Sequence, residues 1–208
     1  MEIILNNAGK RFNREWIFRH MQLEFSGGNR YVITGPNGSG KSTLLQTLAG
    51  YLRLNEGEIS HRIDGRMIAS ENIYTHLSLA APYLSLVEEM TAKELLHFHR
   101  CLKHLSLPEK EILALARLEK DANKQIRYFS SGMKQRLKLA LAFFSDTALL
   151  LLDEPLTNLD ADGASLYHQW MEEHTRNRLV VLASNNPEEY KTCTVEISVD
   201  AARAHTDR

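Results

Sequence analysis

A glycine-rich segment near the amino end of the chain reads Gly35-Pro36-Asn37-Gly38-Ser39-Gly40-Lys41-Ser42-Thr43. This segment matches the phosphate-loop pattern G-x-x-x-x-G-K-[ST]. Residues 30–34 before it are typical of a short buried strand, and residues 42–49 after it carry leucines at helical spacing. Because strand, loop and helix follow in the order that the motif requires, a chance match in an ordinary glycine turn is disfavoured.

The residue types in this loop indicate its chemistry. Glycines allow the backbone N–H groups to surround phosphate oxygens, and the following helix adds the positive end of its dipole. We expect Lys41 to reach the β- and γ-phosphates and the Ser42 hydroxyl to ligate Mg²⁺. The sequence therefore predicts that the chain binds a nucleoside triphosphate together with Mg²⁺.

A second apolar segment ends in two acidic residues. Residues 148–152 are entirely apolar, as expected of a central parallel strand covered on both faces, and Asp153 and Glu154 follow directly. The carboxyl ends of such strands are where α/β sheets place their ligands. We expect Asp153 to hold Mg²⁺, directly or through water, and Glu154 to polarise the attacking water. A solvent-exposed strand end is the alternative.

Composition restricts the class of protein. The chain has 208 residues with 25 basic and 26 acidic side chains and a net charge of −1, which suits one α/β domain with an inserted lobe and argues against nucleic acid as a partner. Cys101 and Cys193 lack metal-ligand spacing and are interpreted as free thiols of a reducing compartment. No signal peptide or bilayer-spanning apolar run is evident. We expect a cytoplasmic protein that contacts membranes through a partner.

The order of patterns predicts one domain over residues 1–208. Its core comprises residues 1–81 and 147–199, a helix-rich lobe spans about 82–146, and residues 200–208 form a disordered tail. Within the lobe, Thr91 to Glu94 has capping-box spacing and opens a helix to about Leu102, and a second helix runs from Pro108 to about Leu118. A further helix is predicted at 161–175 and a buried strand at 179–184. We interpret three histidines of the lobe as lying on a solvated helix face rather than binding metal: His97, His99 and His104.

The spacing of these features resembles the nucleotide-binding domain of ATP-binding-cassette (ABC) transporters. Between the helical lobe and the acidic strand stands Phe129-Ser130-Ser131-Gly132-Met133, where the family carries Leu-Ser-Gly-Gly-Gln. The resemblance implies an α/β P-loop NTPase fold with a central mainly parallel sheet, an N-terminal antiparallel β subdomain and an inserted helical subdomain. It also implies that Ser130, Ser131 and Gly132, at a helix start, hold the γ-phosphate bound to the opposite subunit. A plain N-cap is the alternative for Ser130.

Further positions follow from the resemblance. Residues 157–160 match the family's D-loop, so Asp160 is expected at the nucleotide across a dimer interface. Phe12 stands where an adenine-stacking aromatic is usual, with Trp16 less favoured and core or hairpin packing as the alternative.

Two positions depart from the family. The family has a glutamine at the junction into the helical lobe, whereas residues 79–83 of this chain contain none. The family also has a histidine that touches the γ-phosphate, and Asn185 stands in its place. Asparagine can donate a hydrogen bond to the phosphate but carries no positive charge, so its contact is weaker.

The function that the resemblance implies is an ATP-hydrolysing subunit that powers a membrane transporter through ATP-driven dimer closure. Its partners would be a second ATP-binding subunit, identical or related, and a transmembrane permease subunit docked near residues 79–90, where Leu84, Leu86 and Val87 form either a docking groove or core packing. The protein would then sit on the inner face of the cell membrane. The short length favours the exporter-type or haem-export-type members. A soluble, nucleotide-gated assembly module with weak or no turnover is the alternative.

Overall fold

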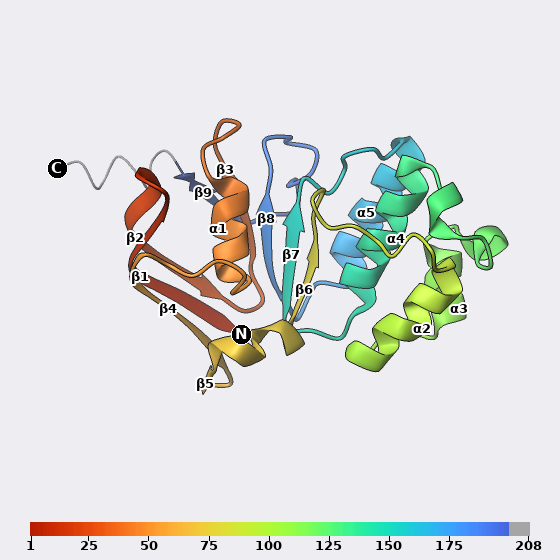
Figure 1. Cartoon of the computed structure of the whole chain (residues 1–208), viewed down its shortest axis with the longest axis horizontal. Helices are drawn as coiled ribbons and strands as arrows, with labels where there is room; N and C mark the ends of the chain where they lie inside the picture. Colours follow the sequence, from red (N-terminus) through yellow and green to blue (C-terminus); the bar gives the residue numbers. More distant parts are fainter. Residues whose placement is uncertain (200–208) are drawn as a thin grey trace.

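The computed structural model describes residues 1–199, so the predicted tail at 200–208 lies outside the described residues. Two sheets form its frame (Figure 1). The first is antiparallel with strand order β2-β1-β4-β5, and the second has the order β6-β7-β8-β3-β9 with parallel neighbours throughout. The mixed α/β fold with an antiparallel N-terminal sheet and a central parallel sheet is confirmed.

The strands of the antiparallel sheet are β1 (Glu2–Phe12), β2 (Glu15–Ser26), β4 (Glu56–Ile63) and β5 (Arg66–Ile68). Those of the parallel sheet are β3 (Arg30–Thr34), β6 (Leu77–Ala80), β7 (Leu149–Asp153), β8 (Leu179–Ala183) and β9 (Val195–Ser198). The α-helices are α1 (Lys41–Leu48), α2 (Ala92–Leu102), α3 (Glu109–Leu115), α4 (Ser131–Phe144) and α5 (Ala161–Glu173). Three short 3₁₀ turns are η1 (Ser70–Thr75), η2 (Glu119–Asp121) and η3 (Ile126–Tyr128).

The parallel sheet separates two hydrophobic cores. In β7, Leu149 and Leu151 pack into the core shared with α1 and the antiparallel sheet, whereas Leu150 and Leu152 pack into the core shared with α2 to α5. All four leucines are fully buried. Alternation of side chains along a strand with both faces covered explains why this segment is continuously apolar. In Figure 1 the helices α4 and α5 cover one side of the sheet, and α1 lies on the side of the antiparallel strands.

Helix boundaries follow local signals. The helix α2 begins and ends where the sequence predicts, because Thr91 accepts a hydrogen bond from Glu94 N–H and the Glu94 carboxylate accepts one from Thr91 N–H at 2.8 Å, which completes the capping box. By contrast, α3 ends at Leu115, three residues before the expected end at Leu118.

The helix α4 is oriented by a buried cation near its carboxyl end. The Arg178 guanidinium donates to the Phe143 carbonyl at 2.9 Å and to the hydroxyls of Ser78 and Thr147 at 2.6 Å each. Burial lowers the pKa of Arg178 to about 10. These bonds join α4 to β6 and to the start of β7, so the amino end of α4 points toward the carboxyl ends of the parallel strands.

Candidate functional site

The phosphate loop lies between β3 and α1 and depends on glycine for its shape. Gly35 has φ 145°, and a Cβ there would stand 2.7 Å from the Ser39 hydroxyl oxygen. Gly40, with φ 102°, is the N-cap of α1, and no side chain caps this helix. The first N–H groups of α1 are therefore free to donate to an anion in the loop, which is how helix starts bind anions.

Lys41 is held against the same loop. Its side chain is only 6% exposed, and Nζ donates to the carbonyl oxygens of Gly35 at 2.7 Å and Pro36 at 3.1 Å. These bonds fix the ammonium beside the loop backbone. A phosphate in the loop would exchange them for charge-assisted bonds to its own oxygens.

Asp153 ends β7 beside the phosphate loop. It is 3% exposed, and burial raises the pKa of its carboxyl, while the nearby Ser42 hydroxyl and the charge of Lys41 act in the opposite direction. Among residues 1–199, no group is hydrogen-bonded to Asp153 Oδ2. A buried carboxylate oxygen without a partner is costly unless something else compensates it. Together with the Ser42 hydroxyl, this oxygen fits the hard oxygen donors that Mg²⁺ requires.

Glu154 adopts a backbone conformation that is rare for its residue type. Its φ is 44°, its N–H donates to the Ala183 carbonyl at 3.0 Å, and its side chain is exposed. Strain of this kind is concentrated at functional sites. The turn brings the carboxylate out of the sheet and toward the cavities described next.

Two adjoining cavities lie at the carboxyl ends of the parallel strands. One, of about 280 Å³, is lined by Ile17, Asn37, Gly38, Gly40, Lys41, Ser42, Thr43 and Glu154. The other, of about 400 Å³, is lined by Asn37, Glu154, Leu156, Thr157, Ser184, Asn185, Asn186 and Glu189. They share Asn37 and Glu154, and Asn185 Nδ2 donates to Asn37 Oδ1 at 3.1 Å. The structure thus brings together the phosphate loop, Glu154 and Asn185.

The sequence did not single out several residues of these cavities, among them Ile17 and Glu189. Ile17 lines the cavity at the phosphate loop, from the hairpin strand β2. Glu189 is buried; its carboxylate accepts from Leu156 N–H at 2.8 Å and from the Ser184 hydroxyl. Burial raises the pKa of Glu189. It therefore ties the segment after Glu154 to the segment that carries Asn185.

The segment Ser130–Gly132 lies at the start of α4. The Ser130 hydroxyl accepts a hydrogen bond from Met133 N–H at 3.2 Å, so Ser130 is an N-cap of this helix. A Cβ on Gly132 would stand 3.1 Å from the Asn158 carbonyl oxygen, which places this segment against the predicted D-loop. Within the described chain, neither Ser131 nor its two neighbours line either of the two cavities. Their contact with a phosphate of another subunit stays a prediction.

Asp160 and Phe12 are also outside the two cavities. Asp160 is the N-cap of α5, with Oδ1 accepting from Gly163 N–H at 2.8 Å. Phe12 ends β1, its ring is 46% exposed, and Lys10 Nζ lies 5.2 Å from the ring centroid. The Trp16 ring is flanked by the guanidinium of Arg19 at 4.6 Å. The nucleotide contacts of Asp160 and Phe12 stay predictions.

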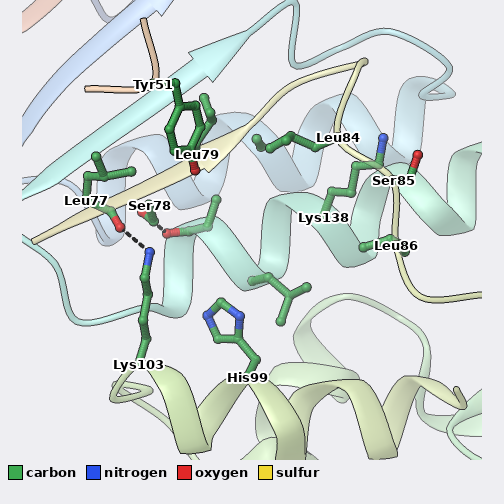
Figure 2. A pocket seen from close by; sticks show the side chains of 13 residues that line it. Tyr51, Leu77, Ser78, Leu79, Leu84, Ser85, Leu86, His99, Lys103 and Lys138 are labelled. Atoms are coloured by element: carbon green, nitrogen blue, oxygen red, sulfur yellow. Dashed lines mark hydrogen bonds between the residues drawn. The ribbon is translucent and has the colours of Figure 1, made fainter. Parts of the chain in front are cut away.

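A third cavity, of about 220 Å³, lies along the edge strand β6 (Figure 2). It is lined by Tyr51, Leu77, Ser78, Leu79, Ala80, Leu84, Ser85, Leu86, His99, Lys103, Lys138, Leu141 and Ala142. Figure 2 shows Lys103 reaching from the end of α2 to the Leu77 carbonyl oxygen, at 2.5 Å. Val87, grouped with Leu84 and Leu86 from the sequence, is not among the lining residues.

The solvated helix face predicted for the three histidines is wrong for His99, which is partly buried, and for His104, which lies beyond the end of α2. His97 and His104 are exposed, but His99 points toward the sheet, and its Nε2 shares a hydrogen bond of 2.7 Å with the Ser145 hydroxyl. Burial lowers the pKa of His99 to about 4. The physical reason is helical spacing, because His99 follows the buried Leu95 and Leu96 by four and three residues.

No helix within residues 1–199 combines the length and the apolar character that crossing a bilayer requires.

Comparison with known proteins identifies the family. The family model described as "ABC transporter" matches residues 18–157. The chain is 31% identical over 193 residues to ABC transporter I family member 1 of Arabidopsis thaliana, covering 89% of this chain and 82% of the relative. It is 33% identical over 156 residues to cytochrome c biogenesis ATP-binding export protein CcmA of Xylella fastidiosa, covering 74% and 70%.

A solved structure shares the fold. An ATP-binding cassette, described as a dimer in a post-hydrolysis state bound to ADP and Pi, superposes with a TM-score of 0.78 at 22% identity over 94% of this chain and 93% of the other. The family model, the relatives and the arrangement of phosphate loop, acidic strand and α4 agree with one another. The chain therefore belongs to the ABC transporter family, as one of its ATP-binding subunits.

Proposed function

We propose that this chain hydrolyses Mg·ATP and powers a membrane transporter by ATP-driven closure of a dimer. The observation that carries the proposal is the meeting of Lys41, Glu154 and Asn185 around two adjoining cavities at one edge of the sheet. The buried Asp153 lies next to Glu154 in the chain and close enough to Lys41 to feel its charge. The loop would bind the phosphates, and Ser42 with Asp153 would hold Mg²⁺, which neutralises charge on the phosphates when bound. Glu154 would orient and deprotonate the attacking water.

The dimer is supported by the position of α4. The amino end of this helix contacts the predicted D-loop rather than the phosphate loop of the same chain. A phosphate contacted by the segment Ser130–Gly132 would therefore be one bound to the phosphate loop of a second subunit, as the resemblance implies. The solved structure with ADP and Pi is itself described as dimeric. A γ-phosphate bound between two subunits would draw them together, and its release would separate them.

Asn185 can stabilise the γ-phosphate without carrying charge. Its amide already donates to Asn37 in the loop, so a small shift would direct that N–H at a phosphate oxygen. A neutral donor contributes roughly half as much as a charged one, so we expect slow turnover rather than none.

Turnover of Glu154→Gln tests the hydrolysis. Loss of a general base lowers rates by about 10²- to 10⁴-fold, so we expect Mg·ATP turnover to fall by about 100-fold or more while Mg·ATP still binds. The exposed Glu119→Gln, in η2, is the matched control and should turn over at the wild-type rate. Equal rates for wild type and Glu154→Gln across a range of protein concentrations would remove Glu154 from the reaction.

The groove at β6 is the proposed docking surface for the transmembrane permease. It joins apolar side chains of the segment after β6, Leu84 and Leu86, to basic side chains of the helices, Lys103 and Lys138. Figure 2 shows these groups around one opening between β6, α2 and α4. A helix or loop of the permease with an apolar face and an acidic residue would complement it. The chain would then sit on the inner face of the membrane, held there by its partner.

Gentle co-purification from native membranes tests this partnership. We expect a multi-helix membrane protein in stoichiometric amount with the wild type, and much less of it with Leu86→Asp, which places a charge in the groove. The exposed Leu102→Asp, at the end of α2, is the control for a charge introduced elsewhere on the surface. Recovery of soluble proteins alone from efficiently extracted membranes would instead support the nucleotide-gated assembly module.

A further inference from the structure

The segments that carry Glu154 and Asn185 leave the parallel sheet side by side. Their strands, β7 and β8, are neighbours in the sheet, and their register ends with Asp153 beside Ala183 (Figure 1). The last backbone bond between them runs from Glu154 N–H to the Ala183 carbonyl at 3.0 Å. Beyond it, both segments consist of bends and turns, and both line the 400 Å³ cavity. Strand pairing therefore joins the two segments only where they begin.

The Glu189 carboxylate joins the same two segments farther along the chain. One of its oxygens, Oε1, accepts from Leu156 N–H at 2.8 Å, and the other, Oε2, accepts from the Ser184 hydroxyl. Leu156 stands two residues after Glu154. Ser184 stands immediately before Asn185. Each carboxylate oxygen is thus used by a different segment, and the carboxylate forms a bridge between them.

Glu189 is itself held in place, so the bridge has a fixed position. The residue is 4% exposed. Its N–H donates to the Asn186 carbonyl at 2.9 Å, and its carbonyl accepts from the buried Tyr167 hydroxyl of α5 at 2.6 Å. The Ser184 hydroxyl in turn accepts from Asn186 N–H at 2.9 Å. Such a network is rigid, because a buried group that left it would lose its hydrogen-bond partner.

We propose that Glu189 is a positioning residue for hydrolysis: its carboxylate holds the segment of Glu154 against the segment of Asn185, so that both side chains face the γ-phosphate of one nucleotide. This inference rests on the proposed hydrolysis of Mg·ATP. It assigns to Glu189 no contact with the nucleotide and no proton transfer. Misplacement of a reacting group by about 1 Å can cost about 100-fold in rate, so a bridge this close to Glu154 affects turnover without touching the substrate.

Glu189→Met keeps a side chain of similar length and removes both hydrogen bonds. We expect kcat for Mg·ATP to fall by about 10-fold or more, because Glu154 and Asn185 are no longer held together. Affinity for a non-hydrolysable ATP analogue should stay at the wild-type value, since Glu189 is not among the lining residues of the cavity at the phosphate loop. Glu188→Met is the matched control and should keep the wild-type kcat. Its side chain is 58% exposed and is not among the lining residues of either cavity.

Glu189→Gln tests whether the two hydrogen bonds carry the effect. Its amide oxygen can accept from Leu156 N–H, and its amide N–H can donate to the Ser184 hydroxyl oxygen, so both segments stay joined. We therefore expect Glu189→Gln to recover most of the kcat that Glu189→Met loses. Equal kcat in the two variants would contradict the role of the bridge.

A double-mutant cycle with Asn185→Ala tests whether Glu189 acts through the residues that it positions. If it does, Glu189→Met should lower kcat by a smaller factor in the Asn185→Ala background than in the wild type, because residues that act as a unit have non-additive effects. A side chain needed only for stability would lower kcat by the same factor in both backgrounds, and that result would contradict the proposal.

Two outcomes distinguish the failure of this inference from the failure of the proposed hydrolysis. If Glu154→Gln turns over Mg·ATP at the wild-type rate, the proposed reaction is wrong, whatever Glu189 does. If Glu154→Gln is slow and Glu189→Met keeps the wild-type kcat, or loses kcat and analogue affinity together, the positioning role is overturned. Ser184→Ala removes one of the two hydrogen bonds and replaces Glu189→Met if that variant fails to fold. It should lower kcat by a smaller factor, and a wild-type kcat in it would overturn the positioning role.

Discussion

The helices α1 and α4 begin in opposite ways. Gly40 precedes α1 in a left-handed conformation, and no side chain caps the helix. Ser130 precedes α4 in an extended conformation, and its own hydroxyl accepts from Met133 N–H. Both helices start at the carboxyl edge of the parallel sheet, where ligands of α/β proteins bind (Figure 1). An uncapped start offers its N–H groups to a ligand, whereas a capped start is stable by itself.

The difference indicates how binding is divided between the two helices. The loop before α1 has Lys41 beside it and requires phosphate to use its N–H groups fully. The start of α4 is complete without a ligand, so a phosphate there would add to an existing cap rather than replace a missing one. We therefore expect nucleotide affinity to depend mainly on the start of α1. We expect turnover in the dimer to depend on the start of α4.

Lys41→Ala, at the start of α1, is expected to have the largest effect, which is a loss of ATP affinity. Bonds between a charged donor and phosphate contribute about 1.5–3 kcal/mol each, so loss of the ammonium should weaken ATP binding by about 100-fold or more. Fluorescence titration with a labelled ATP analogue measures this change. Lys120→Ala, on the exposed turn η2, should bind as wild type does. Unchanged affinity in Lys41→Ala would mean that the phosphates bind somewhere else.

Ser130→Ala is expected to have a smaller effect. It separates the role of Ser130 in helix stability from its proposed role in phosphate contact. Loss of an N-cap costs about 1 kcal/mol of stability, measured by chemical denaturation. If Ser130 also contacts a phosphate of the second subunit, turnover per subunit should fall by roughly 10-fold as well, since a bond to a charged group is lost.

Thr91→Ala provides the structural reference for that variant. Thr91 caps α2 through a complete capping box, remote from both cavities at the sheet edge. It should lose similar stability, about 1 kcal/mol, and keep wild-type turnover. Equal turnover in Ser130→Ala and Thr91→Ala would reduce Ser130 to a plain N-cap.

Local patterns were sufficient to predict most of the fold. The phosphate loop, the apolar strand β7 and the capping box at Thr91 are each encoded by neighbouring residues, and the structure has these elements within a few residues of the predicted bounds. The placement of His99 could also have been predicted, because it continues the buried face formed by Leu95 and Leu96.

The remaining site residues depend on distant pairing. Ile17 lies at the phosphate loop because the hairpin β1-β2 folds against the parallel sheet, which no local pattern in β2 signals. Glu189 accepts hydrogen bonds from Leu156 N–H, 33 residues away in the chain, and from the Ser184 hydroxyl. The end of β6 lies beside the end of β7 only because these strands pair across a long insertion. A single sequence carries no pattern for contacts of this kind.

The strand order has a consequence for how the protein is made. The strands β3 and β7 both pair with β8 and not with each other, so Leu179–Ala183 joins the two halves of the parallel sheet. During synthesis on the ribosome, the phosphate loop emerges early. The strand before it, β3, cannot pair with β8 until residue 183 has been added. Contacts between residues so far apart in sequence fold slowly and leave apolar strands exposed meanwhile. Nascent chains that stop short of β8 would therefore be the ones that require chaperones, although they already contain the whole phosphate-loop sequence.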